Sequence, residues 1–446
     1  MKLIVYLLLI SLFVTEYIAG LAGSAGRAIA WVPEMLSLAA LILIVLRVIA
    51  TKQFLVHPKY VVFFALFVLH VIAGVILNAV QPGAIVQGLR VYLKFFPFFL
   101  LPAVYLFSDQ EMKNQLRLIL LLAVLQFPIV IYQRFVLSAG LETGDYVVGS
   151  LGVSSILSIF LISTVAVLLP FLLNRRLNPI LFVVLLFLLL APTTLNETKG
   201  SFFLLPFAFV VPAIAFAAAR RRIMIVLPVL AAGTLLMAAF LSVYNLSLGW
   251  REQGRSLTEF LDDKKFIEYL YRESEGNKAF MEKAVEDEVG RIDSYILAWK
   301  TLSRDFSKLL LGLGIGNVGP SFSRYLKGEY SERYAHLGPK ISSISYLMWE
   351  VGLIGLALSL LGCYLVFGDA RRLAFAPGVA GTFAQGWLAV VVIYVLSLAY
   401  KNILGFNVIG YLFWYFSGYV AVNALQWRMQ PAPEREPPAP AVATSH

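Results

Sequence analysis

The sequence has few of the residues that catalytic and structural motifs most often require. Its 446 residues include one cysteine, Cys363, which excludes a disulfide framework and a cysteine-rich metal site. The four histidines are too scattered to form a metal cluster: His57, His70, His336 and His446. Neither Gly-x-x-x-x-Gly-Lys-Ser/Thr nor Asp-x-Asp occurs, so neither a phosphate loop nor a metal-dependent nucleotide-sugar site is indicated. We therefore expect no metal and no nucleotide cofactor.

Charged residues are also scarce. They make up 14% of the chain, whereas hydrophobic residues make up 60%. A soluble protein of this composition could not cover its surface with polar side chains, so the sequence predicts a polytopic membrane protein. The net charge of +10 would suit nucleic-acid binding, but the basic residues are distributed as in loops that orient a membrane protein. We expect a lipid bilayer as a partner, and no nucleic acid.

Long hydrophobic runs provide the fold prediction. A helix needs about 20 mostly apolar residues to cross a hydrocarbon layer of ~30 Å at ~1.5 Å per residue. Twelve segments meet this requirement: 3–22, 28–49, 60–79, 85–106, 116–137, 151–173, 178–194, 201–218, 223–244, 343–367, 379–399 and 403–425. The sequence therefore predicts an all-α membrane protein with about twelve transmembrane helices.

Basic clusters between these segments predict the orientation in the membrane. They fall in alternate short loops: Lys52 and Lys59, Lys113 and Arg117, Arg175 and Arg176, Arg220 to Arg222, and Arg371 and Arg372. Short cytoplasmic loops are enriched in Lys and Arg, so we expect these loops and both termini in the cytoplasm. The expected organisation is transmembrane helices in 1–245 and 343–425, an external domain in 246–342, and a disordered Pro- and Ala-rich tail in 426–446.

Segment 246–342 holds almost half of the charges, with fifteen Lys and Arg and fifteen Asp and Glu residues. Its length and balanced charge predict a small helical domain and not just a linker. Ser256 and Glu259 have capping-box spacing at the start of one expected helix. A second, amphipathic helix is expected within 285–305, with these residues on one face: Ile292, Tyr295, Ile296 and Trp299. A glycine-rich turn follows at 311–322.

Ionisable residues inside the expected spans are a further signal, because they are costly in a membrane and mark functional sites by default. Glu16, Glu34, Arg90, Lys94 and Glu350 all lie some residues in from the outer ends of their segments. Arg90 and Lys94 are at i, i+4 and would share a helix face. We interpret this group as a polar cavity that opens outward. The alternative, that Glu16–Arg90 or Glu34–Lys94 are purely structural pairs, stays open.

The junction at 191–206, APTTLNETKGSFFLLP, places charges between two apolar runs. Lys199 precedes Gly200 and Ser201 at the expected outer start of a helix, where backbone N–H groups and a lysine together form an anion site. Arg291 begins the amphipathic helix expected on the same side, and its guanidinium group suits bidentate binding of phosphate. Alternatively, Lys199 is an interfacial lysine and Arg291 a solvated charge.

Two more residues are candidates for the site. His336 is the only histidine in the external domain, and either a catalytic role or a plain surface position fits it. Ser343 lies in KISSISYLMWE, just before an expected span. Hydroxyl groups of this kind cannot act as a general base near neutral pH, but they can orient an acceptor sugar.

The order of several short motifs resembles the O-antigen ligase and O-antigen/exopolysaccharide polymerase superfamily. The matching segments are Thr198-Lys199-Gly200, Arg291 with Trp299, the glycine turn 312–317, Glu350 to Gly355 in the pattern Glu-x-Gly-x-x-Gly, and 144–152. The large external loop before the last three helices is similar as well. Two departures are visible. Lys199 stands where the family has an arginine, and Ser343-Ile344 stands where ligases usually have His-Asn.

The resemblance implies a GT-C-like glycosyltransferase of the bacterial inner membrane that needs no metal. Its donor would be a glycan on undecaprenyl pyrophosphate, and its acceptor a second lipid-linked repeat or the lipid A core, with a chain-length regulator as a further partner. The residues implied in catalysis are Arg291, Lys199 and His336. Those implied in binding the pyrophosphate or the substrate are Arg90, Lys94, Glu350 and Ser343.

Three functions stay open at this point. The missing His-Asn favours a polymerase that lengthens the lipid-linked polysaccharide. The alternative is an O-antigen ligase that transfers this glycan to lipid A core. A multi-span transporter is the alternative from another class, because twelve spans and intramembrane charges suit one. However, no two halves are evident in the sequence, and the large domain follows the ninth expected span instead of the sixth.

Overall fold

The computed structural model describes residues 2–21, 29, 31–137, 144–249, 289–319 and 324–430. Every regular element in this part of the chain is a helix, and no β-strand occurs in it. The predicted fold class, an all-α protein, is confirmed for these residues. The helix expected from Ser256 and the part of the predicted tail beyond residue 430 lie outside the described residues. The tail was expected to be disordered from residue 426, but the chain is helical as far as Met429.

Each of the first nine expected spans coincides with one helix or with consecutive helices. These are α1 (Lys2–Leu21), α3 (Val32–Thr51), α4 (Pro58–Leu77), α5 (Pro82–Tyr92) with α6 (Phe96–Val104), α7 (Asp109–Val124) with α8 (Gln126–Tyr132) and η1 (Gln133–Leu137), α9 (Ser154–Leu173), α10 (Pro179–Leu195), α11 (Gly200–Arg220) and α12 (Val226–Gly249). Two further short turns are η2 (Gly144–Tyr146) and η3 (Ile223–Ile225).

The remaining helices belong to the end of the predicted external domain and to the last three expected spans. They are α15 (Arg291–Leu302), α16 (Phe306–Leu311), η5 (Arg324–Leu326), α17 (Tyr330–Arg333), η6 (Ala335–Leu337), α18 (Ser343–Leu373), α19 (Gly378–Tyr400) and α20 (Asn407–Met429). Among the described residues, 9 helices are long and apolar enough to cross a membrane, or 10 if the bent pair α5–α6 is one span. A helical membrane-spanning protein is therefore confirmed, whereas the count of twelve stays a prediction.

Several helices begin at residues that the sequence marks clearly. Ser108 accepts the N–H of Glu111, and the Glu111 carboxylate accepts the N–H of Ser108, which is a complete capping box at the start of α7. At α10, the side chain of Asn178 accepts the N–H groups of Ile180 and Leu181. These caps satisfy backbone donors that would otherwise be unpaired at the helix ends.

The fourth expected span is broken by Pro97. The axes of α5 and α6 differ by 48°. Proline has no N–H to donate to the carbonyl four residues earlier, and the Leu93 carbonyl instead accepts the N–H of Phe96 at 3.1 Å. Lys94 lies inside this break, and its backbone carbonyl accepts the hydroxyl of Ser37 on α3. The expectation of one continuous helix that carries both Arg90 and Lys94 is therefore wrong.

A second bend lies in α18, at Gly352, whose φ is 63° and ψ is −167°. This conformation, which favours glycine, interrupts the helical hydrogen bonds. The glycine-rich turn fills the gap, because the N–H of Leu313 donates to the Trp349 carbonyl at 2.8 Å and that of Gly314 to the Glu350 carbonyl at 3.0 Å. The turn therefore packs into α18 as part of the fold.

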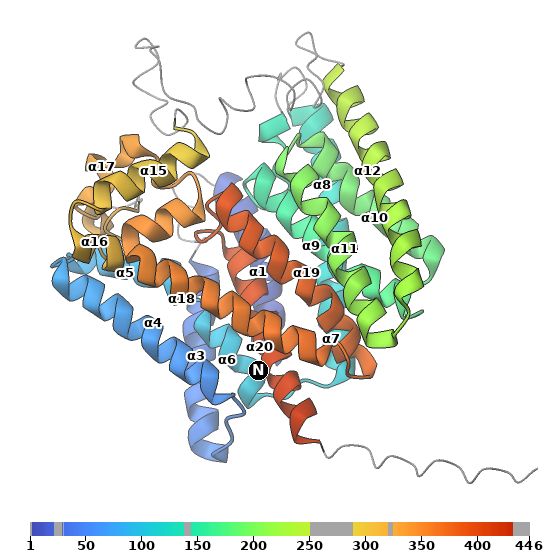
Figure 1. Ribbon diagram of the computed structural model, residues 1–446, viewed down its shortest axis with the longest axis horizontal. Helices are drawn as coiled ribbons and strands as arrows, with labels where there is room; N and C mark the ends of the chain where they lie inside the picture. The colour runs from blue at the N-terminus through green and yellow to red at the C-terminus, as the bar shows by residue number, and fades with distance from the viewer. Residues whose placement is uncertain are drawn as a thin grey trace, which may run out of the picture.

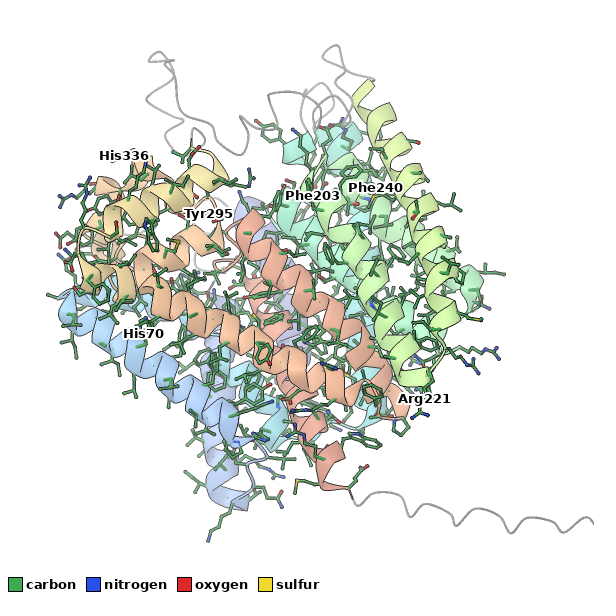
Figure 2. All side chains as sticks on the ribbon, viewed as in Figure 1. His70, Phe203, Arg221, Phe240, Tyr295 and His336 are labelled. Atoms are coloured by element: carbon green, nitrogen blue, oxygen red, sulfur yellow. The ribbon has the colours of Figure 1, made fainter. Side chains whose placement is uncertain are left out.

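The helices form a bundle around a large apolar core (Figure 1). α9, α11 and α19 pack against one another, and α18 runs obliquely across the molecule in contact with α4, α19 and α20. α10 and α12 lie on one flank, whereas α15, α16 and α17 gather near the start of α18 (Figure 1). Figure 2 places Arg221 at one end of the bundle and His336 and Tyr295 toward the opposite end.

The amphipathic helix α15 buries a different face from the one expected. Its buried residues are Ser294, Ala298 and Leu302, whereas Ile296 and Trp299 are exposed. Small residues allow α15 to approach α18 closely, and the hydroxyl of Ser345 donates to the Ser294 carbonyl at 3.4 Å. The predicted apolar face was therefore wrong in part, because hydrophobicity alone does not identify the face that packs most closely.

The predicted orientation is tested with Lys265→Cys, a position outside the described residues. We expect this cysteine to react with a membrane-impermeant thiol reagent in intact spheroplasts, because alternate loops rich in Lys and Arg place 246–342 outside. Arg222→Cys, in a predicted cytoplasmic loop, should react only after lysis. The single native cysteine, Cys363, is buried and should give little background. If the cysteine at 265 is protected in intact spheroplasts and the cysteine at 222 is labelled, the predicted orientation is wrong.

Candidate functional site

Tyr400, the last residue of α19, joins segments that are far apart in the sequence. The Nε of Arg291 donates to the Tyr400 backbone carbonyl at 2.8 Å, and the guanidinium carbon lies 5.0 Å from the centroid of the Tyr400 ring. The Tyr400 hydroxyl accepts the N–H of Gly200 at 3.3 Å. Arg291 at the start of α15 and the Thr198-Lys199-Gly200 motif at the start of α11 therefore meet here. We call Lys199, Gly200, Arg291 and Tyr400 the Tyr400 junction.

The backbone donors at the start of α11 are used within the protein. Besides Gly200, Ser201 donates its N–H to the Thr198 carbonyl at 3.0 Å, and Phe202 donates to the Lys199 carbonyl at 3.2 Å. The expectation of unpaired N–H groups that point at an anion is therefore wrong for this helix start. An anion at the Tyr400 junction would have to be bound by side chains.

Three hydroxyl groups that lie within three residues of Gly200 or Tyr400 along the chain have no partner within the described part of the protein. They belong to Thr198, Ser201 and Ser397, and all three are buried. A buried hydroxyl without a hydrogen bond costs about 1–3 kcal/mol, so such groups are normally satisfied by water or a ligand. The junction thus combines cations with spare hydrogen-bonding capacity, a combination that suits phosphate and sugar hydroxyls.

Asn196 fixes the polar segment that leads into α11. Its side chain is fully buried. The Nδ2 donates to the Ser154 carbonyl and to the Ser158 hydroxyl, both at 2.9 Å, and Oδ1 accepts the N–H of Thr198 at 3.2 Å. The start of α11 is therefore tied to the first turns of α9, which is one of the central helices.

Glu197 connects the same segment to residues 144–149. Its carboxylate accepts Nη2 of Arg134 at 3.3 Å and the N–H of Gly144 at 3.0 Å. Gln133 holds the rest of this segment, because its Oε1 accepts the N–H of Gly149 at 2.7 Å and its Nε2 donates to the Gly149 carbonyl at 2.8 Å. Glu197 is therefore placed to position the loop, whereas Lys199 lies at the junction.

Tyr295 attaches α15 to the end of α19. Its hydroxyl donates to the Ala399 carbonyl at 2.7 Å. Burial raises the pKa of the Tyr295 phenol, and the Ser342 hydroxyl and the Arg291 charge oppose this shift. The phenol therefore stays protonated near neutral pH and remains a donor. Arg291 and Tyr295 both donate hydrogen bonds to backbone carbonyls at the end of α19. The start of α15, and with it Arg291, is therefore attached to α19 at two positions.

Ser343 is fully buried at the first turn of α18. Its hydroxyl accepts the N–H of Ile403 at 2.8 Å and lies 3.2 Å from the Lys401 carbonyl, to which it donates. The hydroxyl therefore anchors the connection between α19 and α20. Ser343 therefore binds the backbone of the residues that follow Tyr400, and these contacts use its hydrogen-bonding capacity.

Glu350 lies in the core and binds the glycine-rich turn. The side chain is fully buried, and its carboxylate accepts the N–H groups of Gly316 at 2.9 Å, Gly319 at 2.9 Å and Val318 at 3.3 Å. Successive N–H groups that converge on one carboxylate form an anion-binding nest. Here Glu350 itself is the bound anion, so the contacts of this residue are with the fold.

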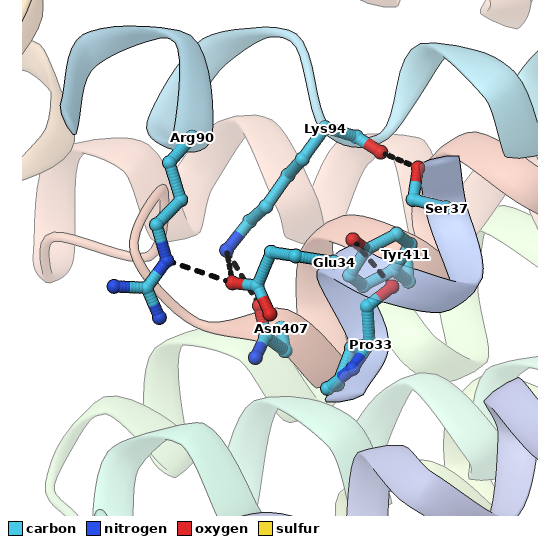
Figure 3. A network of polar contacts seen from close by, with 7 residues as sticks. All are labelled: Pro33, Glu34, Ser37, Arg90, Lys94, Asn407 and Tyr411. Carbon is cyan, nitrogen blue, oxygen red and sulfur yellow. Dashed lines mark hydrogen bonds and ion pairs between the residues drawn. The ribbon is translucent and has the colours of Figure 1, made fainter. Parts of the chain in front are cut away.

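The other intramembrane charges form one network around Glu34 of α3 (Figure 3). Glu34 Oε1 accepts Nε of Arg90 at 2.9 Å and Nζ of Lys94 at 3.2 Å. Lys94 also donates to Oδ1 of Asn407, at the start of α20, at 2.5 Å. Glu16 of α1 is close enough to interact electrostatically with all three charged residues. We call Glu34, Arg90, Lys94 and Asn407 the Glu34 network.

Arg90 is the member of this network that is best placed to bind a ligand. Its side chain is 20% exposed, compared with 7% for Lys94 and 8% for Glu34. The guanidinium carbon lies 4.4 Å from the centroid of the Trp31 ring. Only Nε of Arg90 makes a hydrogen bond within the described residues, so both terminal nitrogens can still bind an anion.

The segment 400–407 connects the two groups. Tyr400 belongs to the Tyr400 junction and Asn407 to the Glu34 network. Seven peptide steps separate these residues, which limits their Cα–Cα distance to at most about 25 Å. The sequence analysis did not predict either residue. A usable signal was present, because the polar stretch YKN follows an apolar span on the side where Lys199 was expected.

His336 lies apart from these groups. It is exposed on η6. In Figure 2 it lies at the edge of the molecule, and Tyr295 lies between it and Phe203 near the start of α11. The described residues also include no group of three or more His, Cys, Asp and Glu side chains that could hold a metal ion.

The close packing at the junction allows a prediction about Gly200. A Cβ atom at this position would lie 2.6 Å from carbons of the Tyr400 ring, which is well inside normal contact. Gly200→Ala is therefore expected to lower the stability of the purified protein by about 1–3 kcal/mol through overpacking. The control is Gly405→Ala, because a Cβ atom there meets nothing within 4 Å. Equal thermal unfolding of the two variants would contradict this packing.

The chain was also compared with known proteins. No family model matches it, and no curated protein matches it.

Proposed function

We propose that the protein is a glycosyltransferase that lengthens oligosaccharides on undecaprenyl pyrophosphate at the periplasmic face of the bacterial inner membrane, as a polymerase for O-antigen or exopolysaccharide. The observation that carries this proposal is the Tyr400 junction. There, Arg291 and the Thr198-Lys199-Gly200 motif, which resemble separate motifs of that enzyme family, contact the same tyrosine.

The proposed reaction is a displacement at the anomeric carbon of the donor sugar. An oxygen of an acceptor hydroxyl forms the new bond to this carbon, and the bond from the carbon to the pyrophosphate oxygen breaks. The electron pair leaves with the lipid pyrophosphate, and the hydroxyl proton passes to a base or to solvent. Arg291 and Lys199 stabilise the charge that develops on the leaving group, as preorganised cations do in other enzymes.

The geometry supports this role for Arg291 because the side chain is oriented before any ligand binds. Its Nε donates a hydrogen bond to the Tyr400 carbonyl, and its guanidinium carbon lies 5.0 Å from the centroid of the Tyr400 ring. A cation that needs no reorientation stabilises a transition state more effectively than a mobile one. In the proposal, the buried hydroxyls of Thr198, Ser201 and Ser397 bind phosphate or sugar oxygens beside it.

Arg90 is proposed as the second pyrophosphate-binding residue. Glu34 holds its Nε, which leaves the terminal nitrogens for phosphate oxygens. Lys94 acts in this proposal through Glu34 and Asn407, whose positions it fixes. Ser343 and Glu350 are proposed to shape the site through the backbone segments that they bind. His336 is proposed as a secondary contributor that contacts the acceptor.

The test of the proposal is the glycan profile of a deletion strain. A polymerase mutant should accumulate single repeat units on undecaprenyl pyrophosphate, and the wild-type gene should restore long chains. If long lipid-linked chains persist while lipopolysaccharide loses its O-chain, the ligase function is correct instead. If vesicles that contain the purified protein take up labelled sugar or lipid without forming a glycosidic bond, the protein is a transporter.

Lys199→Arg provides a sharper test of the motif assignment. We expect this variant to retain most of the polymer formed by the wild type, because it keeps the positive charge and introduces the residue of the family motif. Lys199→Gln, of similar length but neutral, should reduce the rate by about 10²–10³, the usual cost of losing one donor to a developing anion. Polymer length and amount in complemented cells measure both. Equal activity of the two variants would remove the Lys199 charge from the mechanism.

A further inference from the structure

A cavity of about 520 Å³ lies between α7, α9, α19 and α20. Its volume is in the range of sites that hold a small ligand, roughly 300–1,000 Å³. Most of its wall is apolar, for example at Ile119, Phe160, Phe171, Trp387, Val390 and Leu412. Nothing in the proposed glycosyl transfer uses this space.

The charged residues of the lining are all basic: Lys113, Arg117 and Arg176. Lys113 and Arg117 lie one turn apart on α7, and Arg176 follows the last turn of α9. The acidic residues at the start of α7 are engaged elsewhere, because Glu111 pairs with Lys2 and Asp109 accepts the N–H of Val379 at 3.4 Å. One end of the cavity is therefore positively charged.

The length of the cavity fits one leaflet of a bilayer. Along α9 the lining extends from Ile159 to Phe171, which corresponds to about 18 Å at ~1.5 Å per residue. Half of a hydrocarbon layer of ~30 Å is about 15 Å. An apolar space of this length with a cationic end matches an acyl chain that carries an anionic headgroup.

The basic end lies opposite to the Tyr400 junction along α9. Asn196, which leads into the junction, binds the Ser154 carbonyl at the first turn of α9, whereas Arg176 follows the other end of this 20-residue helix. A lipid-linked glycan donor whose pyrophosphate is bound at the Tyr400 junction cannot also place that pyrophosphate at Arg176, beyond the other end of α9. The enrichment of cytoplasmic loops in Lys and Arg accounts for basic residues on this side, but the apolar cavity that opens beside three of them fits a separate lipid of the opposite leaflet.

We propose that this cavity binds an anionic phospholipid, with one acyl chain between α7, α9, α19 and α20 and the headgroup phosphate at Lys113, Arg117 and Arg176. By the predicted orientation, the lipid comes from the cytoplasmic leaflet. The site does not rest on the proposed glycosyl transfer. Its chemical basis is an apolar wall for the chain and three cations for one phosphodiester.

The test is native mass spectrometry of the purified full-length protein, titrated with dioleoyl phosphatidylglycerol or with dioleoyl phosphatidylcholine. We expect one molecule of phosphatidylglycerol to bind more than tenfold more tightly than phosphatidylcholine. In the triple variant Lys113→Gln/Arg117→Gln/Arg176→Gln this affinity should fall by about 100-fold, since each basic residue near the headgroup contributes roughly fivefold. The matched control, Arg175→Gln/Arg222→Gln/Arg371→Gln, makes the same change in net charge outside the cavity lining and should bind like the wild type.

A second variant tests the apolar part of the site. Ser163 lines the cavity on α9, and Ser163→Phe should fill the space and abolish binding of phosphatidylglycerol, whereas Ser163→Ala should not. The proposal is overturned if the triple variant or Ser163→Phe binds phosphatidylglycerol like the wild type. It is also overturned if phosphatidylcholine binds equally well, or if undecaprenyl phosphate displaces phosphatidylglycerol at lower concentration, which would make the cavity a site for the donor's chain.

Discussion

Cells that carry Arg291→Ala as their only copy should form almost no polymer. The guanidinium group of Arg291 is oriented by the Tyr400 carbonyl and lies near the Tyr400 ring, so its loss removes a preorganised cation from the proposed leaving-group site. The loss of one such donor costs about 10²–10³ in rate. Polymer length and amount should be measured together with the quantity of protein in the membrane.

Arg291→Lys should restore little activity. A lysine ammonium group keeps the charge, but it lacks the planar fork that can bind the Tyr400 carbonyl and a phosphate oxygen at the same time. Arg304→Ala is the matched control, because Arg304 is an exposed arginine just after α15. Arg304→Ala should leave polymer formation unchanged. Near-normal polymer from a stably expressed Arg291→Ala protein would remove Arg291 from the site.

The helical elements were predictable because a bilayer imposes a simple requirement. A span must be apolar over about 20 residues, and a sequence that is 60% hydrophobic shows such runs clearly. The interruptions were harder to predict. Pro97 is visible in the sequence and explains why Lys94 lies in a break. The bend at Gly352 was not predictable in the same way, because it depends on the glycine-rich turn that packs into it.

The candidate site was only partly predictable. Arg90, Lys94 and Glu34 could be selected individually, because charge is costly inside a span. Their partner Asn407 is neutral and lies at the start of a helix, so no rule of this kind selects it. Tyr400 is a further example, since tyrosine is common at the ends of spans. Its contacts with Arg291 and Gly200 depend on the packing of α11, α15 and α19.

The Glu34 network should be the most sensitive part of the molecule to loss of a single charge. Glu34→Leu removes the only acidic partner that Lys94 contacts directly among the described residues, and the Lys94 side chain is 7% exposed. A buried charge without a partner destabilises a protein by about 3–5 kcal/mol. We therefore expect a large fall in the thermal stability of the purified protein in detergent. Glu329→Ala, which removes an exposed carboxylate, should have little effect.

The double variant Glu34→Leu/Lys94→Leu separates the charge from the rest of the packing. When both members of a buried pair become apolar, no unpaired charge remains, and the change in stability is often close to neutral. Arg90 can lose Glu34 at lower cost, because it is more exposed and lies over the Trp31 ring. The double variant should therefore recover at least half of the stability that Glu34→Leu loses. If it is instead less stable than the single variant, Lys94 is held mainly by Asn407 and the ion pair with Glu34 is not what stabilises this network.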